Sequence, residues 1–310
     1  MPILRSSSKA ARKAARAPLG KIEHGGITKA RQNRNLRSAA YFTAWTMMMG
    51  IGTTADPELL RQAMVSFVGH CWQEGDGKDI CCSAIYGICA LLSLESKVFF
   101  KTAWKLLKRW SVLELPQQAP PALRLEVLAL AGLAWNQQKK GLAIGILLAY
   151  DLFLRTGEWT NLRLDAIEAG GSAATIALGL TKGVQRRGGV ESVTCRDPLL
   201  VRQLVWLKSE RGGGKLVEDS EAHIRVWLKQ AAVRLGIADR KLTPYSFRRG
   251  GLSAASLDGV PVSTLALRAR WLDARIATVY IQEGEQTLRA LKLQPSVAAK
   301  LQAAAKLLFR

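Results

Sequence analysis

The sequence predicts a mainly α-helical protein of two domains, with a small β-hairpin or sheet in the second domain. Apolar residues recur at helical spacing from about residue 35 to residue 110. A segment rich in proline and glutamine, residues 113–122, then interrupts that pattern. Between about residues 174 and 195, short runs with β-branched residues are typical of strands.

The length of the chain indicates how many domains it forms, and its charge indicates which class of partner it binds. The 310 residues suffice for two domains, and a hydrophobic content of 48% suffices for a packed core in each. The 45 Lys and Arg against 24 Asp and Glu give a net charge of +21. Such a charge attracts polyanions, so nucleic acid is the first expected partner, and an anionic membrane surface or an acidic protein is the second. The longest apolar run, 142–150, is far shorter than the ~20 residues that span a bilayer, so we expect no membrane segment.

The first 34 residues are expected to form a basic, disordered tail. The first 40 residues contain ten basic residues and one acid. This composition is typical of a DNA-contacting tail or a nuclear signal, and an organellar transit peptide is the alternative. The expected location is therefore the nucleus in a eukaryote and otherwise the cytoplasm on DNA, with organellar targeting by the basic N-terminus as the other option.

Cysteine and histidine give no sign of a metal site. The five cysteines are odd in number and lack the paired CxxC and HxxxH spacing of zinc sites, and the three histidines are scattered. We expect reduced cysteines in the core, which suggests an intracellular location. The cysteines are Cys71, Cys81, Cys82, Cys89 and Cys195.

Residues 35–112 are predicted to form a helical domain. Asp56 and Pro57 are typical of a helix start, and Leu60, Met64 and Phe67 follow at helical spacing. Two further apolar segments cover about 80–94 and 100–110. Basic residues interleave with the aromatic residues of the last segment, and they form either a solvated face beside a buried one or a DNA-facing helix. They are Lys97, Lys101, Lys105, Lys108 and Arg109.

Residues 123–310 are predicted to form the second domain. Helices are expected at 123–136 and 142–154, and the second is nearly apolar all round and therefore buried. Strands at 174–180 and 190–195 enclose the basic turn TKGVQRRGG, which indicates a β-hairpin. Helices follow at 198–210 and 220–235, the latter ended by Gly236, and a last helix begins at about residue 296.

Several residues in this domain suit cleavage of a phosphodiester without a metal, which needs a nucleophile, cationic donors and an acid for the leaving oxygen. Arg155 is expected at the end of a buried helix, where its charge needs an anion or a carboxylate, and Glu158 is placed to orient it. Arg248 and Arg249 stand together in YSFRRGG, and the two glycines after them permit a close approach of another chain's backbone.

With these features the sequence resembles the tyrosine recombinases, also called phage-type integrases, and in particular divergent members from eukaryotic mobile elements. The match runs over about residues 123–285 and depends on motifs that occur in the family's order. They are Arg155 and Glu158 in LRTGE, Lys182 in LTKG, Tyr245 and Arg248 in YSFR, Trp271 in RARW, and Tyr280 nine positions after that tryptophan.

The resemblance implies a helical core-binding domain that clamps DNA, a catalytic domain, and site-specific recombination or integration without a cofactor. Arg155 and Arg248 would hold the scissile phosphate, with Trp271 and Tyr245 donating to its oxygens. Tyr280 would attack to form a 3′-phosphotyrosyl link while Lys182 protonates the 5′-oxygen. The expected partner is double-stranded DNA, bound by a homotetramer on paired sites. Further contacts to DNA are expected from Arg186, Arg187, Arg268 and Arg270, with Arg249 in a supporting role.

Tyr245 departs from the family's pattern, which has histidine at this position. A phenol can donate a hydrogen bond, but with a pKa near ~10 it is a poor general base at neutral pH. The alternative function is therefore a catalytically lapsed, recombinase-derived protein that binds or shapes DNA. An RNA-binding protein is a third interpretation, but no RNP-like aromatic strand motif supports it. Tyr280 also has a structural interpretation, since Ile276, Val279 and Tyr280 form an apolar stripe that would pack in a core.

Overall fold

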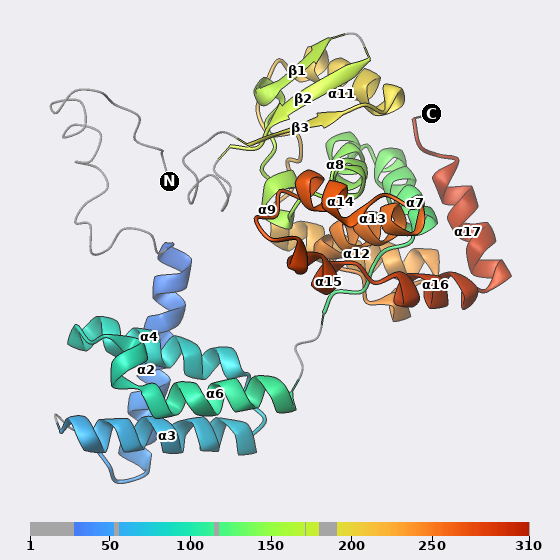
Figure 1. Ribbon diagram of the computed structural model, residues 1–310. Coiled ribbons are helices and arrows are strands. Elements are labelled where there is room, and N and C mark those ends of the chain that lie inside the picture. The colour runs from blue at the N-terminus through green and yellow to red at the C-terminus, as the bar shows by residue number, and fades with distance from the viewer. Residues whose placement is uncertain (1–27, 53–55, 115–117, 171, 180–190, 310) are drawn as a thin grey trace, which may run out of the picture. The chain divides into compact units, whose positions relative to one another are not determined.

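The computed structural model describes residues 28–52, 56–114, 118–170, 172–179 and 191–309 (Figure 1). The chain divides into two compact units, and the second begins at Gln118. This division falls inside the segment 113–122, where a linker was expected. Lys182, Arg186 and Arg187, which belong to the expected hairpin turn, lie outside the described residues, as does the tail up to residue 27.

The N-terminal unit consists of helices at the positions that the apolar periodicity indicates. The helices are α2 (Lys29–Met48), α3 (Pro57–Gln73), α4 (Lys78–Leu92), α5 (Ser96–Phe99) and α6 (Lys101–Leu113). Asp56 starts α3 as expected, since its side chain accepts hydrogen bonds from the first backbone N–H groups of the helix. Helix α2 packs on α4, and α3 packs on α6.

The expected boundary of the basic tail at residue 34 is wrong, because α2 begins at Lys29. The Thr28 hydroxyl accepts a hydrogen bond from the Arg31 N–H and caps the helix. Asn35, Ala39 and Phe42 are buried at helical spacing, so they hold this helix against its neighbours.

The basic residues of α5 and α6 are exposed, while Ala103, Leu107 and Trp110 on the other face of α6 are buried. This arrangement agrees both with a solvated face and with a DNA-facing helix. The exposed residues are Lys97, Lys101, Lys105, Lys108 and Arg109.

The C-terminal unit is mainly helical with one small sheet. Its long helices are α7 (Arg124–Asn136), α8 (Lys140–Asp151), α11 (Pro198–Arg211), α12 (Glu221–Leu235), α13 (Pro244–Leu257), α16 (Glu283–Leu291) and α17 (Pro295–Ala305). Its short ones are α9 (Thr156–Trp159), α14 (Val262–Arg268) and α15 (Ala277–Tyr280), with 3-10 turns η3 (Leu164–Ala166), η4 (Ala238–Arg240) and η5 (Ala274–Ile276).

The expected hairpin is present as β2 (Ala173–Ala177) and β3 (Ser192–Cys195), which pair antiparallel with Ala174 opposite Cys195. A third strand, β1 (Ile167–Gly170), was not expected and pairs antiparallel with β2. Its four residues are too few to show an alternation in the sequence. Helix α11 packs beside this sheet at one end of the unit (Figure 1).

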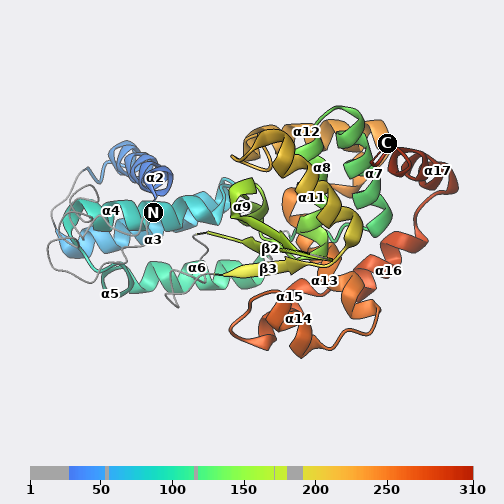
Figure 2. The ribbon, with the colours of Figure 1, turned by 90° about the horizontal axis from the view of Figure 1, so that it is seen from above.

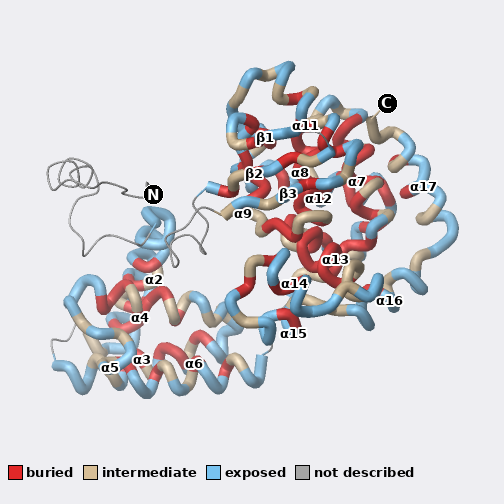
Figure 3. Tube along the Cα trace, turned by 45° about the horizontal axis from the view of Figure 1, so that its top comes forward, coloured by how far each residue is buried: buried red, intermediate tan, exposed pale blue. Residues whose placement is uncertain are grey.

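The core of the unit surrounds α8, which is buried from Gly141 to Tyr150 (Figure 3). Helix α13 packs on this core through two glycines. A Cβ atom on Gly250 would lie 2.1 Å from the Ala122 carbonyl oxygen, and one on Gly251 would lie 2.0 Å from that of Tyr150. The glycines therefore admit the protein's own backbone, and the expected approach of another chain at this place is wrong. This close packing fixes Arg248 and Arg249 relative to the core.

A small second cluster of apolar side chains lies on the other side of α13, where Figure 2 shows α14 and α15. Tyr280 and Ile281 pack against this satellite cluster, which is separate from the core around α8. Its buried members are Phe153, Leu252, Leu265, Ala266, Ala269, Trp271 and Ala277.

Within the described residues, no helix is both long and apolar enough to cross a bilayer. Nor do three or more His, Cys, Asp or Glu side chains in that part of the chain come together so that they could hold a metal ion. The five cysteines are free thiols, and all but the half-buried Cys82 are buried.

Candidate active site

Arg155 and Glu158 form the expected pair, although Arg155 does not end the long buried helix. Helix α8 ends at Asp151, and Arg155 is the residue that precedes the first turn of α9. Its backbone N–H donates to Glu158 Oε2 at 2.8 Å, and its Nη1 donates to Glu158 Oε1 at 2.5 Å. The Arg155 side chain stays 28% exposed, against 6% for Glu158. The carboxylate therefore holds the guanidinium at the surface of the unit.

Arg270 is a second partner of Glu158, with 2.5 Å between its Nη2 and Glu158 Oε2. Its Nε lies 3.7 Å from Glu191 Oε2, and its side chain is 8% exposed. Burial raises the pKa of Glu158, but the charges of Arg270 and Arg155 outweigh this effect, so the pKa lies below its ordinary value. Arg270 is therefore not a free surface cation, because its guanidinium pairs with Glu158 and lies near Glu191, and its contact with DNA stays a prediction.

Arg248 is fully buried on α13. Its Nη1 donates to the Phe153 carbonyl oxygen and its Nη2 to that of Ala269 at 2.9 Å. The guanidinium carbon lies 5.8 Å from the ring centre of Trp271 and 5.4 Å from that of Tyr280. Burial, followed by the positive charges of Arg155 and Arg270, lowers the pKa of Arg248 to about 10.

This environment corrects one step of the sequence argument, which assumed that a structural role for Arg248 needs a buried acid. Two main-chain carbonyls and two aromatic faces take the place of that acid. In this conformation Arg248 presents no N–H group to solvent, since the rings of Tyr280 and Trp271 cover it. Its contact with a phosphate stays a prediction.

Tyr245 and Tyr280 form a phenol pair: the Tyr245 hydroxyl donates to the Tyr280 hydroxyl at 2.5 Å. The ring centre of Trp271 lies 4.9 Å from that of Tyr280. Burial, and next the hydrogen bond to Tyr280, raise the pKa of Tyr245 well above its ordinary value, so Tyr245 remains a donor. The residue at the family's histidine position therefore contacts the expected nucleophile itself.

The apolar stripe of Ile276, Val279 and Tyr280 is not buried as a whole, although Tyr280 itself packs against the satellite cluster as the structural interpretation expects. Ile276 and Val279 are 37% and 50% exposed, so they do not belong to a core. Tyr280 is half-buried, and its partners come from α13 and from the segment before η5.

Arg249 supports the end of α15. Its Nη2 donates to the Val279 carbonyl oxygen at 2.6 Å and to Gln118 Oε1. The Gln282 side chain also donates to Gln118 Oε1, at 3.2 Å. Gln118 thus joins Arg249 and Gln282 at this site, and a glutamine within a proline-rich segment gives no sequence signal for such a role.

The structure brings most of the predicted catalytic residues together. They form two groups of contacts, one of Arg155 with the supporting residue Glu158 and Arg270, the other of Tyr245, Arg248, Trp271 and Tyr280. The charges of Arg155 and Arg270 act on Arg248 and so relate the two groups. The Arg248 guanidinium beside the phenol pair, with the charges of Arg155 and Arg270 acting on it, favours a phosphodiester beside an oxygen nucleophile. Arg268 lies apart, with its guanidinium 4.7 Å from the ring centre of Phe153. The basic residues of α5 and α6 belong to the other unit.

Comparisons with known proteins identify the fold of the chain. No protein-family model matches the sequence, and a search of curated proteins gives no match. The Tn1549 transposon integrase in complex with transposon right-end DNA is similar in structure, with a TM-score of 0.60 at 10% identity over 92% of this chain and 96% of that chain. The XerH site-specific recombinase in a post-cleavage complex with difH has a TM-score of 0.52 at 11% identity, over 81% and 75% of the two chains. The chain thus has the fold of the tyrosine recombinases.

Proposed function

We propose that this protein is a site-specific DNA recombinase or integrase that cuts and rejoins DNA through a 3′-phosphotyrosyl intermediate on Tyr280. The observation that carries the proposal is the position of Tyr280, whose ring lies over the buried Arg248 guanidinium and whose hydroxyl accepts from Tyr245. The net charge of +21 and the DNA in the complexes of both structural relatives support DNA as the substrate.

In the proposed reaction, the Tyr280 oxygen attacks the phosphorus atom and loses its proton to water, while the bond to the 5′-oxygen breaks. The leaving oxygen takes a proton, which the resemblance assigns to Lys182. Arg155, held by Glu158, neutralises charge on the phosphate oxygens. A 5′-hydroxyl from a partner duplex then attacks the phosphotyrosine, which restores a phosphodiester and the free phenol.

Arg248 enters this scheme only when the site opens. Its guanidinium is covered by the rings of Tyr280 and Trp271. As Tyr280 turns toward the phosphate, with Tyr245 still donating to its oxygen, its ring moves off the guanidinium and uncovers the cation that stabilises the new negative charge. The guanidinium of Arg248 would then become exposed only as DNA binds.

A catalytically lapsed DNA-binding protein is the second candidate, and the phenol pair is the observation that favours it. Tyr245 stands where the family has histidine, and its raised pKa keeps the phenol protonated at neutral pH, so it provides no general base there. The protein would then use its positive charge and its fold to bind DNA without cleaving it.

A suicide substrate separates the two functions. A nicked duplex carrying a site recovered by binding selection should trap a covalent adduct with the wild-type protein. Tyr280→Phe should abolish the adduct and leave DNA affinity unchanged, whereas Tyr41→Phe, in the other unit, should leave both unchanged. Absence of an adduct on every selected site would establish the lapsed function. Arg248→Ala should weaken both binding and cleavage, and unchanged cleavage would remove Arg248 from the site.

A further inference from the structure

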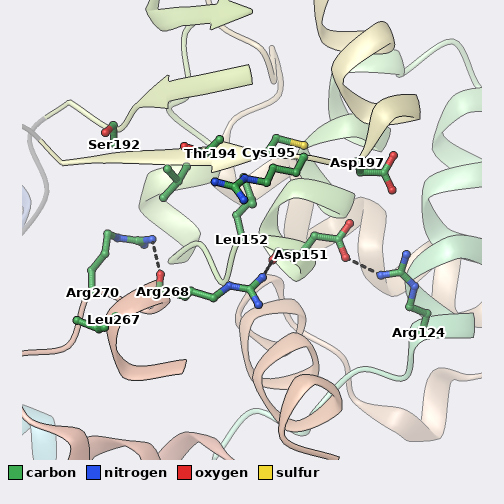
Figure 4. A pocket seen from close by; sticks show the side chains of 12 residues that line it. Arg124, Asp151, Leu152, Ser192, Thr194, Cys195, Asp197, Leu267, Arg268 and Arg270 are labelled. Carbon is green, nitrogen blue, oxygen red and sulfur yellow. Dashed lines mark hydrogen bonds and ion pairs between the residues drawn. The ribbon is translucent and has the colours of Figure 1, made fainter. Parts of the chain in front are cut away.

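A cavity of about 640 Å³ adjoins the active site, between β3, the end of α8 and the segment that follows α14 (Figure 4). Four arginines and two aspartates line it. Arg270 belongs to this lining and also pairs with Glu158, so the cavity and the active site share one guanidinium. The other charged lining residues are Arg124, Asp151, Arg196, Asp197 and Arg268.

Both aspartates of the cavity are already engaged. Asp151 Oδ1 pairs with Arg124 Nη1 at 2.5 Å. Asp197 caps α11, where its Oδ1 accepts from the backbone N–H groups of Leu199 and Leu200 at 2.9 and 3.0 Å. Neither aspartate of the lining therefore forms an ion pair with the other three arginines, Arg196, Arg268 and Arg270.

Two of those arginines, Arg196 and Arg268, are exposed. Arg268 donates to the Asp151 carbonyl oxygen at 3.2 Å and lies against the ring of Phe153, so its contacts fix the side chain without neutralising it. Arg196 directly follows β3. The free charge of the cavity is therefore positive, which favours an anion.

Strand β3 adds hydroxyl groups to these cations. Ser192 and Thr194 are exposed and Cys195 is buried, as the alternation of a strand requires. In Figure 4 the two hydroxyl-bearing residues lie across the cavity from Arg268 and Arg270. Both residues line the cavity with the arginines, and hydroxyl and guanidinium groups are the donors that bind phosphate oxygens. No aromatic ring is among the described residues of the lining, so the cavity offers no surface on which a base could stack.

We infer that this cavity binds a second phosphate of the DNA backbone, next to the scissile one, and that Arg270 couples this subsite to Glu158 and Arg155. The inference rests on the proposed function in taking DNA as the ligand. A free phosphate or a nucleotide has the same chemistry, but the missing stacking surface and the continuity with the active site favour the backbone of a bound duplex.

The test uses the double variant Arg196→Ala/Arg268→Ala in the full-length protein. Both side chains are exposed, so we expect the melting temperature to stay within about 2 °C of wild type. Loss of one phosphate contact should reduce the slope of log Kd against log salt concentration by about 0.9. Arg163→Ala is the matched control, because Arg163 is an exposed arginine that pairs with Asp165 outside the cavity. A slope for the double variant equal to that of the control would overturn the inference.

A second arm identifies the phosphate. In a duplex with a mapped cleavage position, single neutral methylphosphonate linkages are introduced one at a time. We expect one linkage beside the scissile phosphate whose neutralisation weakens wild-type binding about tenfold, which is ~1.4 kcal/mol, and leaves the double variant unaffected. Equal weakening of both proteins at every linkage would overturn the subsite.

A third arm addresses free phosphate and the proposed function. If inorganic phosphate alone raises the melting temperature of the wild type and not of the double variant, while the salt slopes agree, the site serves a free anion and the DNA assignment is wrong. If the wild type forms its covalent adduct and the double variant keeps the wild-type slope, only this inference fails. If the wild type forms no adduct but the slopes differ as expected, the recombinase function fails and the subsite stands.

Discussion

The phenol pair yields a quantitative prediction for Tyr245→Phe. The substitution removes one hydroxyl group, which donates to the Tyr280 hydroxyl at 2.5 Å. The phenyl ring keeps the aromatic contact, in which the two ring centres lie 5.9 Å apart. We therefore expect a folded protein whose DNA affinity stays within about twofold of wild type, because this hydroxyl donates to Tyr280, in place of the phosphate contact that the resemblance implies.

The expected loss in the cleavage rate follows from the charge on the acceptor. As Tyr280 attacks, its oxygen carries negative charge, and a hydrogen bond to a charged group contributes roughly 1.5–3 kcal/mol. This energy corresponds to a cleavage rate roughly 10- to 150-fold slower. Burial and the bond to Tyr280 raise the pKa of Tyr245, so the donor stays protonated throughout the neutral and mildly alkaline range. The ratio of the two rates should therefore be constant from about pH 7 to 9.

The rate of adduct formation on a nicked duplex, measured in a single turnover, provides the assay. Tyr245→His keeps a donor at the position, so its rate should exceed that of Tyr245→Phe at every pH in this range. Tyr41→Phe is the matched control, because it loses a 3.1 Å hydrogen bond to Asp76 in the other unit. A rate for Tyr245→Phe within twofold of wild type would refute the proposed donation, as would an equal loss in the control.

Three further predictions concern stability and binding. Burial raises the pKa of Tyr150 from 10.0 to about 12. Because the pKa is raised in the folded state, the free energy of unfolding should fall as pH rises from 10 toward 12. Urea unfolding should therefore give a free energy about 1.4 kcal/mol lower at pH 11 than at pH 8, and Tyr150→Phe should remove this difference. Gly251→Ala should lower the free energy of unfolding by about 3 kcal/mol, since its Cβ would meet the Tyr150 carbonyl; Gly284→Ala, with open space around it, should change it by less than about 1 kcal/mol, and an equal loss would contradict the packing argument. Raising salt from 50 to 200 mM should lower DNA affinity about a thousandfold if six or more phosphates are neutralised, and a flat response would exclude DNA as the partner.

Much of the fold could be predicted because its signals are local. The helices of the N-terminal unit, the hairpin and the buried α8 each show their period in the sequence. The pair of Arg155 and Glu158 is also local, since the two residues are three positions apart. Trp271 and Tyr280 were found by their spacing, and their rings are in contact.

The remaining features depend on contacts between distant parts of the chain. Arg270 meets Glu158 across 112 positions, and it does so with a φ of 60°, a backbone conformation that is uncommon for a residue other than glycine. The Nη1 and Nη2 groups of Arg248 donate to carbonyl groups, which every residue carries and no sequence pattern marks. Gln118 reaches Arg249 across 131 positions. Pattern and spacing contain no information on such partners.

The satellite cluster that holds Tyr280 has a consequence for cooperativity. Its apolar side chains are separate from those around α8, so residues 262–281 can unfold locally while the main core stays intact. Amide hydrogens of α14 and α15 should then exchange with solvent at a free energy below that of global unfolding, whereas those of α8 should exchange only when the whole unit unfolds. The proposed nucleophile would thus belong to a less stable cooperative unit than Arg248, which is anchored on α13 beside the core. Such a division lets the tyrosine move toward DNA while the helix that carries Arg248 stays folded, and it frees the guanidinium from the Ala269 carbonyl oxygen and from the two rings.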